Sequence, residues 1–337
     1  GNEVFHAAGN CLIETNTKTL FLGCSSSVIP ADGSITSIGD NAFAGCRSLT
    51  GITIPQGVIR IGKSAFQECS GLTSITLPQG VASIGQGAFD GCSGLTSITL
   101  SQGVTSIGRF AFSECSSLTS ITLPEGVISI GENAFYGCSS LTTITLPSSV
   151  TSIGESAFYK CGHLESVVIP QGVTSIGDMT FQFCDNLTSV TIPEGVTNIG
   201  MQAFLECSRL TDIVLPSSVT SIGNSAFSGC SSLTSITLPK SVTSFGDNVF
   251  FRCKSLTSLA LPQGVTHIEK REFYGFDKLI SITLPESVTS IGDGAFSECS
   301  SLTSITLPKS VTSFGTYVFS GCSNLTSLAL PQGVTCI

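Results

Sequence analysis

Apolar residues recur along this chain in a pattern that repeats every 23 residues without an insertion or deletion. A Phe marks the period, a Cys follows three residues later in all coils but one, and a Leu stands three residues further on. The Phe stands at Phe43, Phe66, Phe89, Phe112, Phe135, Phe158, Phe181, Phe204, Phe227, Phe250, Phe273, Phe296 and Phe319. Because a fixed period of this length is typical of repeat architectures, the sequence predicts a solenoid of stacked coils.

Two segments of each coil are predicted to be β-strands. In residues 72–78, Ile75 and Leu77 alternate with Ser and Thr, and this period of two indicates a half-buried strand. Pro78 cannot donate a further ladder hydrogen bond, so the strand is expected to end there. Residues 81–85 are short and β-branched, which favours a second strand.

The third segment of each coil is predicted to be a short helix. Ala134, Phe135, Cys138 and Leu141 have the spacing of one helix face, and the segment is long enough for one or two turns of α or 3₁₀ helix. The residue after the repeated Gly of each coil is expected to cap the start of the helix. Such residues are Asp40, Glu132, Glu155, Asp178, Asn224, Asp247 and Asp293. The fold class is therefore an α/β repeat solenoid.

The chain divides into a capping segment and a repeat array. Residues 1–34 are irregular and contain a polar hairpin, because two short apolar runs flank Thr15, Asn16 and Thr17. Residues 35–337 hold about 13 repeats. Residues 287–337 repeat residues 218–268 almost letter for letter and stop in mid-coil, so no C-terminal cap is expected and further sequence is expected to follow.

Most of the 15 cysteines are predicted to be buried free thiols rather than parts of a disulfide framework. Twelve share one repeat position, where parallel side chains of stacked coils hold Cβ atoms beyond the usual ~3.5–4.5 Å of a disulfide. They are Cys46, Cys69, Cys92, Cys115, Cys138, Cys161, Cys184, Cys207, Cys230, Cys253, Cys299 and Cys322. Phe276 replaces the Cys in one coil, which shows that this position accepts an ordinary apolar side chain. The cysteines are therefore expected to act as small apolar residues that fill the core. Whether Cys11 and Cys24 form a disulfide stays an open question.

Composition and charge exclude several classes of partner. A net charge of −9 disfavours nucleic acid and anionic membranes, because both require basic surfaces. No run of 18 apolar residues exists, so no membrane insertion is expected. No secretory signal is visible, although the chain opens on Gly1 rather than Met, so this absence does not indicate the compartment.

The repeat LxxIxLPxxVTSIGxxAFxxCxxL resembles the BspA-like class of leucine-rich repeats over residues 35–337, and the opening GNCLIETNTKTLFLGC is similar to the lead-in of gut-bacterial members. The resemblance implies a curved, right-handed superhelix in a secreted or surface-attached bacterial protein that takes part in adhesion. The departures are Ser101 for Pro, Phe245 and Phe314 for Ile, and residues 269–276. No binding residue transfers from the family.

Catalytic and metal chemistry are not expected from the sequence. His6, His163 and His267 occupy different repeat positions in distant coils, so no nucleophile, base and orienting group assemble from them. There is no CxxC motif and no His pair, and one Cys per coil gives a line rather than a tetrahedron. The prediction is a non-enzyme without cofactor or metal.

Two surfaces remain as candidate binding sites. The outward strand positions form rows of Ser and Thr that suit a protein strand or a glycan, or that serve only cross-strand fit on a wet face. Residues 136–214 break the uniformity of the repeat. The candidate residues are Tyr136, Tyr159, Phe183 and Leu205 beside the repeated Phe, and Glu165, Val168, Asp212 and Val214 on the strands. The aromatic set either forms an exposed patch or packs in part against the neighbouring predicted helices.

The sequence thus favours a non-enzymatic extracellular or cell-surface scaffold that binds protein, other cells or glycans. A passive spacer that holds another domain away from the cell surface is the alternative, and a spacer would have uniform outward residues. Weak self-association through the open ends of the solenoid is a further expected contact.

Overall fold

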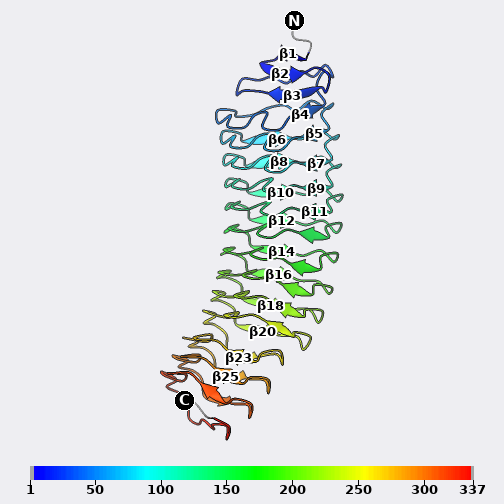
Figure 1. Cartoon of the computed structure of the whole chain (residues 1–337). Coiled ribbons are helices and arrows are strands. Elements are labelled where there is room, and N and C mark those ends of the chain that lie inside the picture. Colours follow the sequence, from blue (N-terminus) through cyan, green and yellow to red (C-terminus); the bar gives the residue numbers. More distant parts are fainter. Residues whose placement is uncertain (1–3, 335–337) are drawn as a thin grey trace. The chain divides into compact units, whose positions relative to one another are not determined.

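The protein is described by a computed structural model over residues 4–334. The chain forms two compact units, Gly1–Gly172 and Val173–Ile337. Within each unit, coils of 23 residues stack one on the next, and each regular coil contributes one strand to each of two parallel rows (Figure 1). Stacking in this manner buries the apolar side of every coil under its neighbours.

The first unit begins with an antiparallel hairpin that joins the array. Its strands are β1 (Phe5–Ala8), β2 (Cys11–Glu14) and β3 (Thr19–Leu22). β2 pairs antiparallel with β3, which confirms the predicted hairpin. β3 then pairs in parallel with the first strand of the array, so the hairpin and the coils share one sheet.

The short-strand row is made of two-residue strands, which confirms the second predicted strand. The strands of the first unit are β4 (Ser37–Ile38), β5 (Arg60–Ile61), β7 (Ser83–Ile84), β9 (Ser106–Ile107), β11 (Ser129–Ile130) and β13 (Ser152–Ile153). Those of the second unit are β15 (Ser175–Ile176), β17 (Asn198–Ile199), β19 (Ser221–Ile222), β21 (Ser244–Phe245), β23 (His267–Ile268), β25 (Ser290–Ile291) and β27 (Ser313–Phe314).

The long-strand row is made of three-residue strands with a buried centre and exposed ends. The first unit holds β6 (Ser74–Thr76), β8 (Ser97–Thr99), β10 (Ser120–Thr122), β12 (Thr143–Thr145) and β14 (Ser166–Val168). The second holds β16 (Ser189–Thr191), β18 (Asp212–Val214), β20 (Ser235–Thr237), β22 (Ser258–Ala260), β24 (Ser281–Thr283) and β26 (Ser304–Thr306). Paired residues differ by 23, as in Ile75↔Ile98.

The predicted α or 3₁₀ helix is wrong, because no helix occurs among residues 4–334. In the Phe135 coil, Asn133 and Gly137 have left-handed φ values of 55° and 68°, which a right-handed helix does not accept. The N–H of Phe135 donates to the carbonyl of Ala157 in the next coil (2.9 Å), whereas the N–H of Cys138 donates back to Phe135 (3.1 Å). Single turns therefore alternate with bonds between coils.

The predicted helix caps also bind between coils. The side-chain Oδ1 atoms of Asp40, Asp178, Asn224 and Asp293 each accept a backbone N–H from the following coil, at 2.9, 2.7, 3.0 and 2.8 Å. Since no helix starts at these residues, their carboxylate or amide groups tie one coil to the next.

The core of each unit is a stack of phenylalanine rings. Phe43 to Phe158 in the first unit have ring centroids 5.2–5.5 Å apart, and every ring of this run is fully buried. Offset stacking at this distance adds favourable ring contacts to the burial of apolar area. The repeated Phe therefore forms the core of this run of coils.

The cysteines of the array are free thiols, and most are fully buried, as predicted. Their hydrogen bonds were not foreseen from the sequence. The Sγ of Cys138 donates to the carbonyl of Phe112 in the preceding coil at 3.1 Å, and Cys161 donates to Phe135 at 3.2 Å. Cys11 and Cys24 are free as well. Cys336 lies outside the described residues.

Candidate functional site

One coil of the second unit departs from the repeat at four positions. In the Phe273 coil, His267 stands where most coils have Ser, and Glu269 stands where the others have Gly. Glu272 replaces the usual Ala, and Phe276 replaces the Cys. The repeat makes these replacements visible, and three of the four lie around one cavity.

Glu269 prevents the Phe273 coil from lying against its predecessor at the regular distance. At the equivalent position, a Cβ atom on Gly246 would lie 2.4 Å from the backbone N of Asn224, and one on Gly315 would lie 2.3 Å from the N of Asp293. Since real Cβ contacts are longer than this, only Gly allows the close approach of two coils. A glutamate here therefore holds the two coils apart.

The break between the Phe250 coil and the Phe273 coil is called the seam below. Among residues 4–334, the short-strand row of the second unit is interrupted here, with β15–β17–β19–β21 on one side and β23–β25–β27 on the other. The ring stack is interrupted too within these residues: Phe250 packs on Phe245 (6.1 Å), and Phe273 packs edge-on against Phe276 (5.5 Å). Both the short-strand ladder and the stack of rings are therefore interrupted at the seam.

A buried carboxylate bridges the seam. Glu272 is 5 % exposed, and its Oε2 and Oε1 accept the backbone N–H groups of Asn248 (2.7 Å) and Phe250 (3.4 Å). In the preceding pair of coils, Phe227 donates the equivalent bond to a backbone carbonyl. Burial raises the pKa of Glu272 from 4.5 to about 7, and the nearby charges of Asp247 and Glu269 act in the same direction.

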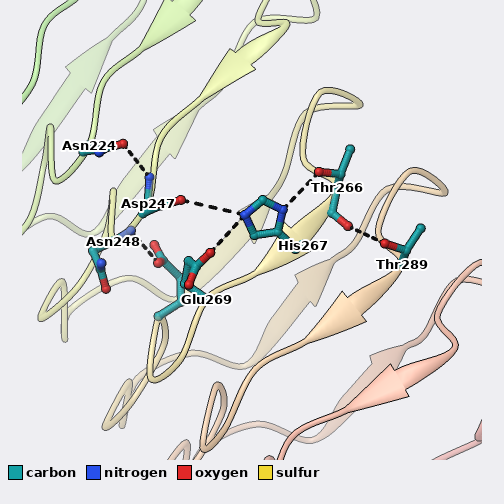
Figure 2. A network of polar contacts seen from close by, with 8 residues as sticks. Asn224, Asp247, Asn248, Thr266, His267, Glu269 and Thr289 are labelled. Atoms are coloured by element: carbon teal, nitrogen blue, oxygen red, sulfur yellow. Dashed lines mark hydrogen bonds and ion pairs between the residues drawn. The ribbon is translucent and has the colours of Figure 1, made fainter. Parts of the chain in front are cut away.

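Asp247, His267 and Glu269 meet at the solvent side of the seam (Figure 2). The Nε2 of His267 lies 2.9 Å from Oε1 of Glu269 and 3.9 Å from Oδ1 of Asp247, and all three atoms lie within 4.8 Å of one another. Asp247 comes from the turn after β21, whereas the other two come from β23 and the residue after it. The three groups thus converge from both sides of the seam.

Neighbouring groups orient this cluster. The hydroxyl of Thr266 lies 3.1 Å from Nδ1 of His267, which leaves Nε2 directed at the two carboxylates (Figure 2). The hydroxyl of Thr289 donates to the carbonyl of Thr266 at 3.1 Å. The backbone N–H of Asp247 donates to Oδ1 of Asn224 at 3.0 Å. Such outer contacts are what fix the orientation of metal-binding histidines.

A small cavity adjoins the cluster. It has a volume of about 40 Å³ and is lined by Asp247, His267, Glu269 and Glu272 together with apolar side chains and backbone. No Lys or Arg is among the described residues that line it. Lys270 and Arg252 lie nearby in sequence but pair with Asp293 (3.8 Å) and Glu206 (3.9 Å).

The aromatic residues predicted to form a patch are half-buried, and they divide between the two units. In the first unit, Tyr136 and Tyr159 stack on each other with centroids 4.9 Å apart, and the Nζ of Lys160 lies 5.4 Å from the Tyr159 centroid. In the second unit, Phe183 and Leu205 are half-buried as well. Each tyrosine therefore offers part of its surface and packs the rest against its neighbour.

The four strand candidates lie on the exposed side of the long-strand row. Val168 ends β14 in the first unit and is 65 % exposed, and Glu165 precedes the same strand and is exposed. Val214 ends β18 in the second unit at 77 % exposure, and Asp212 begins that strand. Both valines occupy a position where most strands of this row have Thr.

Sequence reasoning missed the Asp247–His267–Glu269 cluster because each residue type was considered by itself. The signal was present in the alignment of the repeats, where residues 265–276 hold several replacements at once. Two exposed tyrosines were missed as well: Tyr274 and Tyr317 line an open groove with Arg271, whose guanidinium lies 5.6 Å from the Tyr274 ring.

Comparison with known families finds one match that extends over most of the chain. The model described as "BspA type Leucine rich repeat region (6 copies)" matches residues 15–139, 105–234 and 221–337. A comparison with curated protein sequences finds no match. No helix in residues 4–334 has the length and apolar character needed to cross a membrane.

Solved structures of bacterial leucine-rich repeat proteins are similar to this chain. A leucine-rich repeat protein from Bacteroides ovatus is 31 % identical, with 95 % of this chain and 91 % of that chain covered and a TM-score of 0.79. A leucine-rich cell surface protein from Faecalibacterium prausnitzii is 30 % identical, with 89 % and 94 % covered and a TM-score of 0.54. A leucine-rich repeat protein from Eubacterium ventriosum is 25 % identical, with 86 % of each chain covered and a TM-score of 0.52.

Proposed function

Because this chain belongs to the BspA-type leucine-rich repeat family, we propose that it acts at a cell surface as an adhesive scaffold that binds a protein ligand without catalysis. Leucine-rich repeats form extended surfaces that bind other proteins. A surface location is supported by the similar Faecalibacterium prausnitzii structure, which is described as a cell surface protein. The long-strand row is the proposed contact surface.

The observation that carries the proposal is the exposed side of the long-strand row. Its strands bury a central Ile, Val or Leu and expose both flanking residues, so the row presents repeated hydroxyl groups. Val168 and Val214 add an exposed apolar side chain to this polar surface, one in each unit. Apolar residues within a polar surround are typical of protein interfaces.

The variant Val168→Thr with Val214→Thr is expected to weaken ligand binding about tenfold, or about 1.4 kcal/mol. Threonine is the usual residue at this position and restores the uniform surface, so folding is expected to be unchanged. The ligand is first identified by screening the chain against host matrix proteins and glycans on an array. Surface plasmon resonance then compares the variant with wild type and with Ile128→Thr, an exposed apolar residue (52 %) outside the long-strand row.

A second variant distinguishes the strands from the turns. Tyr136→Ala with Tyr159→Ala removes the stacked pair on the turn side of the first unit. Loss of binding in this variant, together with unchanged binding of the valine variant, would move the interface to the turns and contradict the proposal. Binding to glycans alone would replace the protein ligand by a carbohydrate.

The passive spacer is supported by the uniformity of the strands. Six of the eleven long strands share the sequence Ser-Ile-Thr: β6, β8, β10, β20, β24 and β26. A screen in which no matrix protein, cell or glycan binds the intact chain would favour this alternative.

A further inference from the structure

We propose that Asp247, His267 and Glu269 form a site for a divalent transition-metal cation such as Zn²⁺, which joins the two coils across the seam. The site goes beyond the proposed binding function and does not depend on it. One ligand comes from the turn after β21 and two come from β23 and the residue that follows. The cation would therefore link coils that the strand ladder does not link.

The separation of the three ligand atoms suits a metal ion. Zn²⁺ binds His nitrogen and carboxylate oxygen at about 2.0–2.2 Å, so neighbouring ligands of a tetrahedral ion lie about 3.4 Å apart. Nε2 of His267 lies 2.9 Å from Oε1 of Glu269 and 3.9 Å from Oδ1 of Asp247. All three ligand atoms lie within 4.8 Å of one another, so side-chain rotation is expected to bring them to bonding distance around one ion.

The charge around the site calls for a cation. The cavity is lined by three carboxyl groups, those of Asp247, Glu269 and Glu272, and its described lining contains no Lys or Arg. Carboxylates in one cavity repel each other unless a cation or a proton lies between them. The space of about 40 Å³ admits a water molecule, which supplies the remaining coordination position.

The orientation of the His267 imidazole also favours a metal ion. The contact between Nδ1 of His267 and the hydroxyl of Thr266 leaves Nε2 as the atom that faces the carboxylates (Figure 2). A mixed set of one imidazole and two carboxylates is typical of Zn²⁺ and related divalent transition metals rather than of Ca²⁺ or Mg²⁺, which prefer oxygen ligands alone. Three protein ligands leave the ion open to water.

The origin of the site in the repeat supports a specific role. His267 and Glu269 replace Ser and Gly, and Glu269 occupies a position where a side chain keeps the coils apart. The duplicated segment, residues 287–337, has Thr316 and Cys336 where residues 218–268 have Asp247 and His267. The duplicated segment therefore lacks the Asp and the His of this cluster.

Isothermal titration with Zn²⁺ tests the site on the full chain after its accessible thiols have been alkylated. One Zn²⁺ per chain is expected for wild type. His267→Ser restores the usual repeat residue at an exposed position and is expected to weaken binding by about tenfold or more. His163→Ser is the matched control, because His163 is an exposed histidine in the first unit, and it is expected to bind like wild type.

The thermal midpoint gives a second readout. Zn²⁺ is expected to raise the thermal midpoint of wild type and of His163→Ser, because an ion bound to the folded state stabilises it. The midpoint of His267→Ser is expected to stay unchanged, because this variant lacks one of the ligands. Absence of binding to wild type would overturn the proposal. Equal affinity of wild type and His267→Ser would do so as well, since the ion would then lie elsewhere.

Discussion

Wild type is expected to lose about 3 kcal/mol of its free energy of unfolding as the pH rises from 4.5 to about 7, and Glu272→Gln is expected to abolish this pH dependence. The pKa of Glu272 rises from 4.5 to about 7 on folding, because its carboxyl group is buried. Each unit of difference between the folded and the unfolded state corresponds to about 1.4 kcal/mol. The difference between the folded and the unfolded pKa therefore corresponds to about 3 kcal/mol.

The sign of the effect follows from proton binding. The folded state binds the proton of Glu272 more tightly than the unfolded state, so this contribution is fully present below pH 4.5. It is lost as the pH rises through about 7, where the folded carboxyl group ionises. Wild type is therefore expected to lose stability between these pH values, whereas Glu272→Gln keeps a hydrogen-bond acceptor that does not titrate.

Urea denaturation followed by circular dichroism at pH 4 to 8, in the presence of a chelator, measures the difference. Glu298→Gln is the matched control, because Glu298 is exposed in the next coil, and it is expected to follow wild type at every pH. A Glu272→Gln profile that is parallel to wild type would show that Glu272 is not buried at the seam.

Phe135→Ala is expected to destabilise the first unit by about 4 kcal/mol. The Phe135 ring is fully buried, and its centroid lies 5.5 Å from those of both Phe112 and Phe158. Truncation removes the contacts with both neighbouring rings and leaves a cavity that the rigid strand rows cannot close. In a repeat array this loss acts on two coil interfaces at once.

Thermal denaturation and urea denaturation both measure the loss. Thr145→Ala in the same coil is the control, since Thr145 is exposed at the end of β12 and its change is expected to stay within about 0.5 kcal/mol. A loss below about 1 kcal/mol in Phe135→Ala would mean that the ring does not lie between packed coils.

The sequence predicts most of the fold because each coil repeats the same apolar positions. The alternation around Ile75 and the β-branched run before Gly85 correspond to the two strand rows, and the repeated Phe forms the core. The predicted helix failed for a physical reason. Apolar residues at helical spacing also suit a chain of single turns. Every second N–H group of this segment, as at Asn133, Phe135 and Gly137, donates to the next coil instead of to the preceding turn.

The sites are less predictable than the fold. Exposure of Val168 and Val214 follows directly from strand alternation, which places every second residue on the outer side. Tyr136 and Tyr159 are partly buried because their rings stack on each other, and the turns that carry them contain left-handed residues that the apolar pattern does not reveal. The Asp247 cluster required knowledge of which residues of adjacent coils face each other across the seam.

Residue-resolved alkylation of the native protein is the most direct test of coil stacking, because the array offers a thiol in nearly every coil. Cys24 is exposed, and hydrogen bonds from Ser26 lower its pKa, whereas burial raises the pKa of Cys69 to about 12. Mass spectrometry after a brief iodoacetamide pulse at pH 8 is expected to show Cys24 modified first, and Cys115 and Cys138 protected until the protein unfolds. Native-state labelling of Cys115 and Cys138 as fast as that of Cys24 would contradict the stacked core.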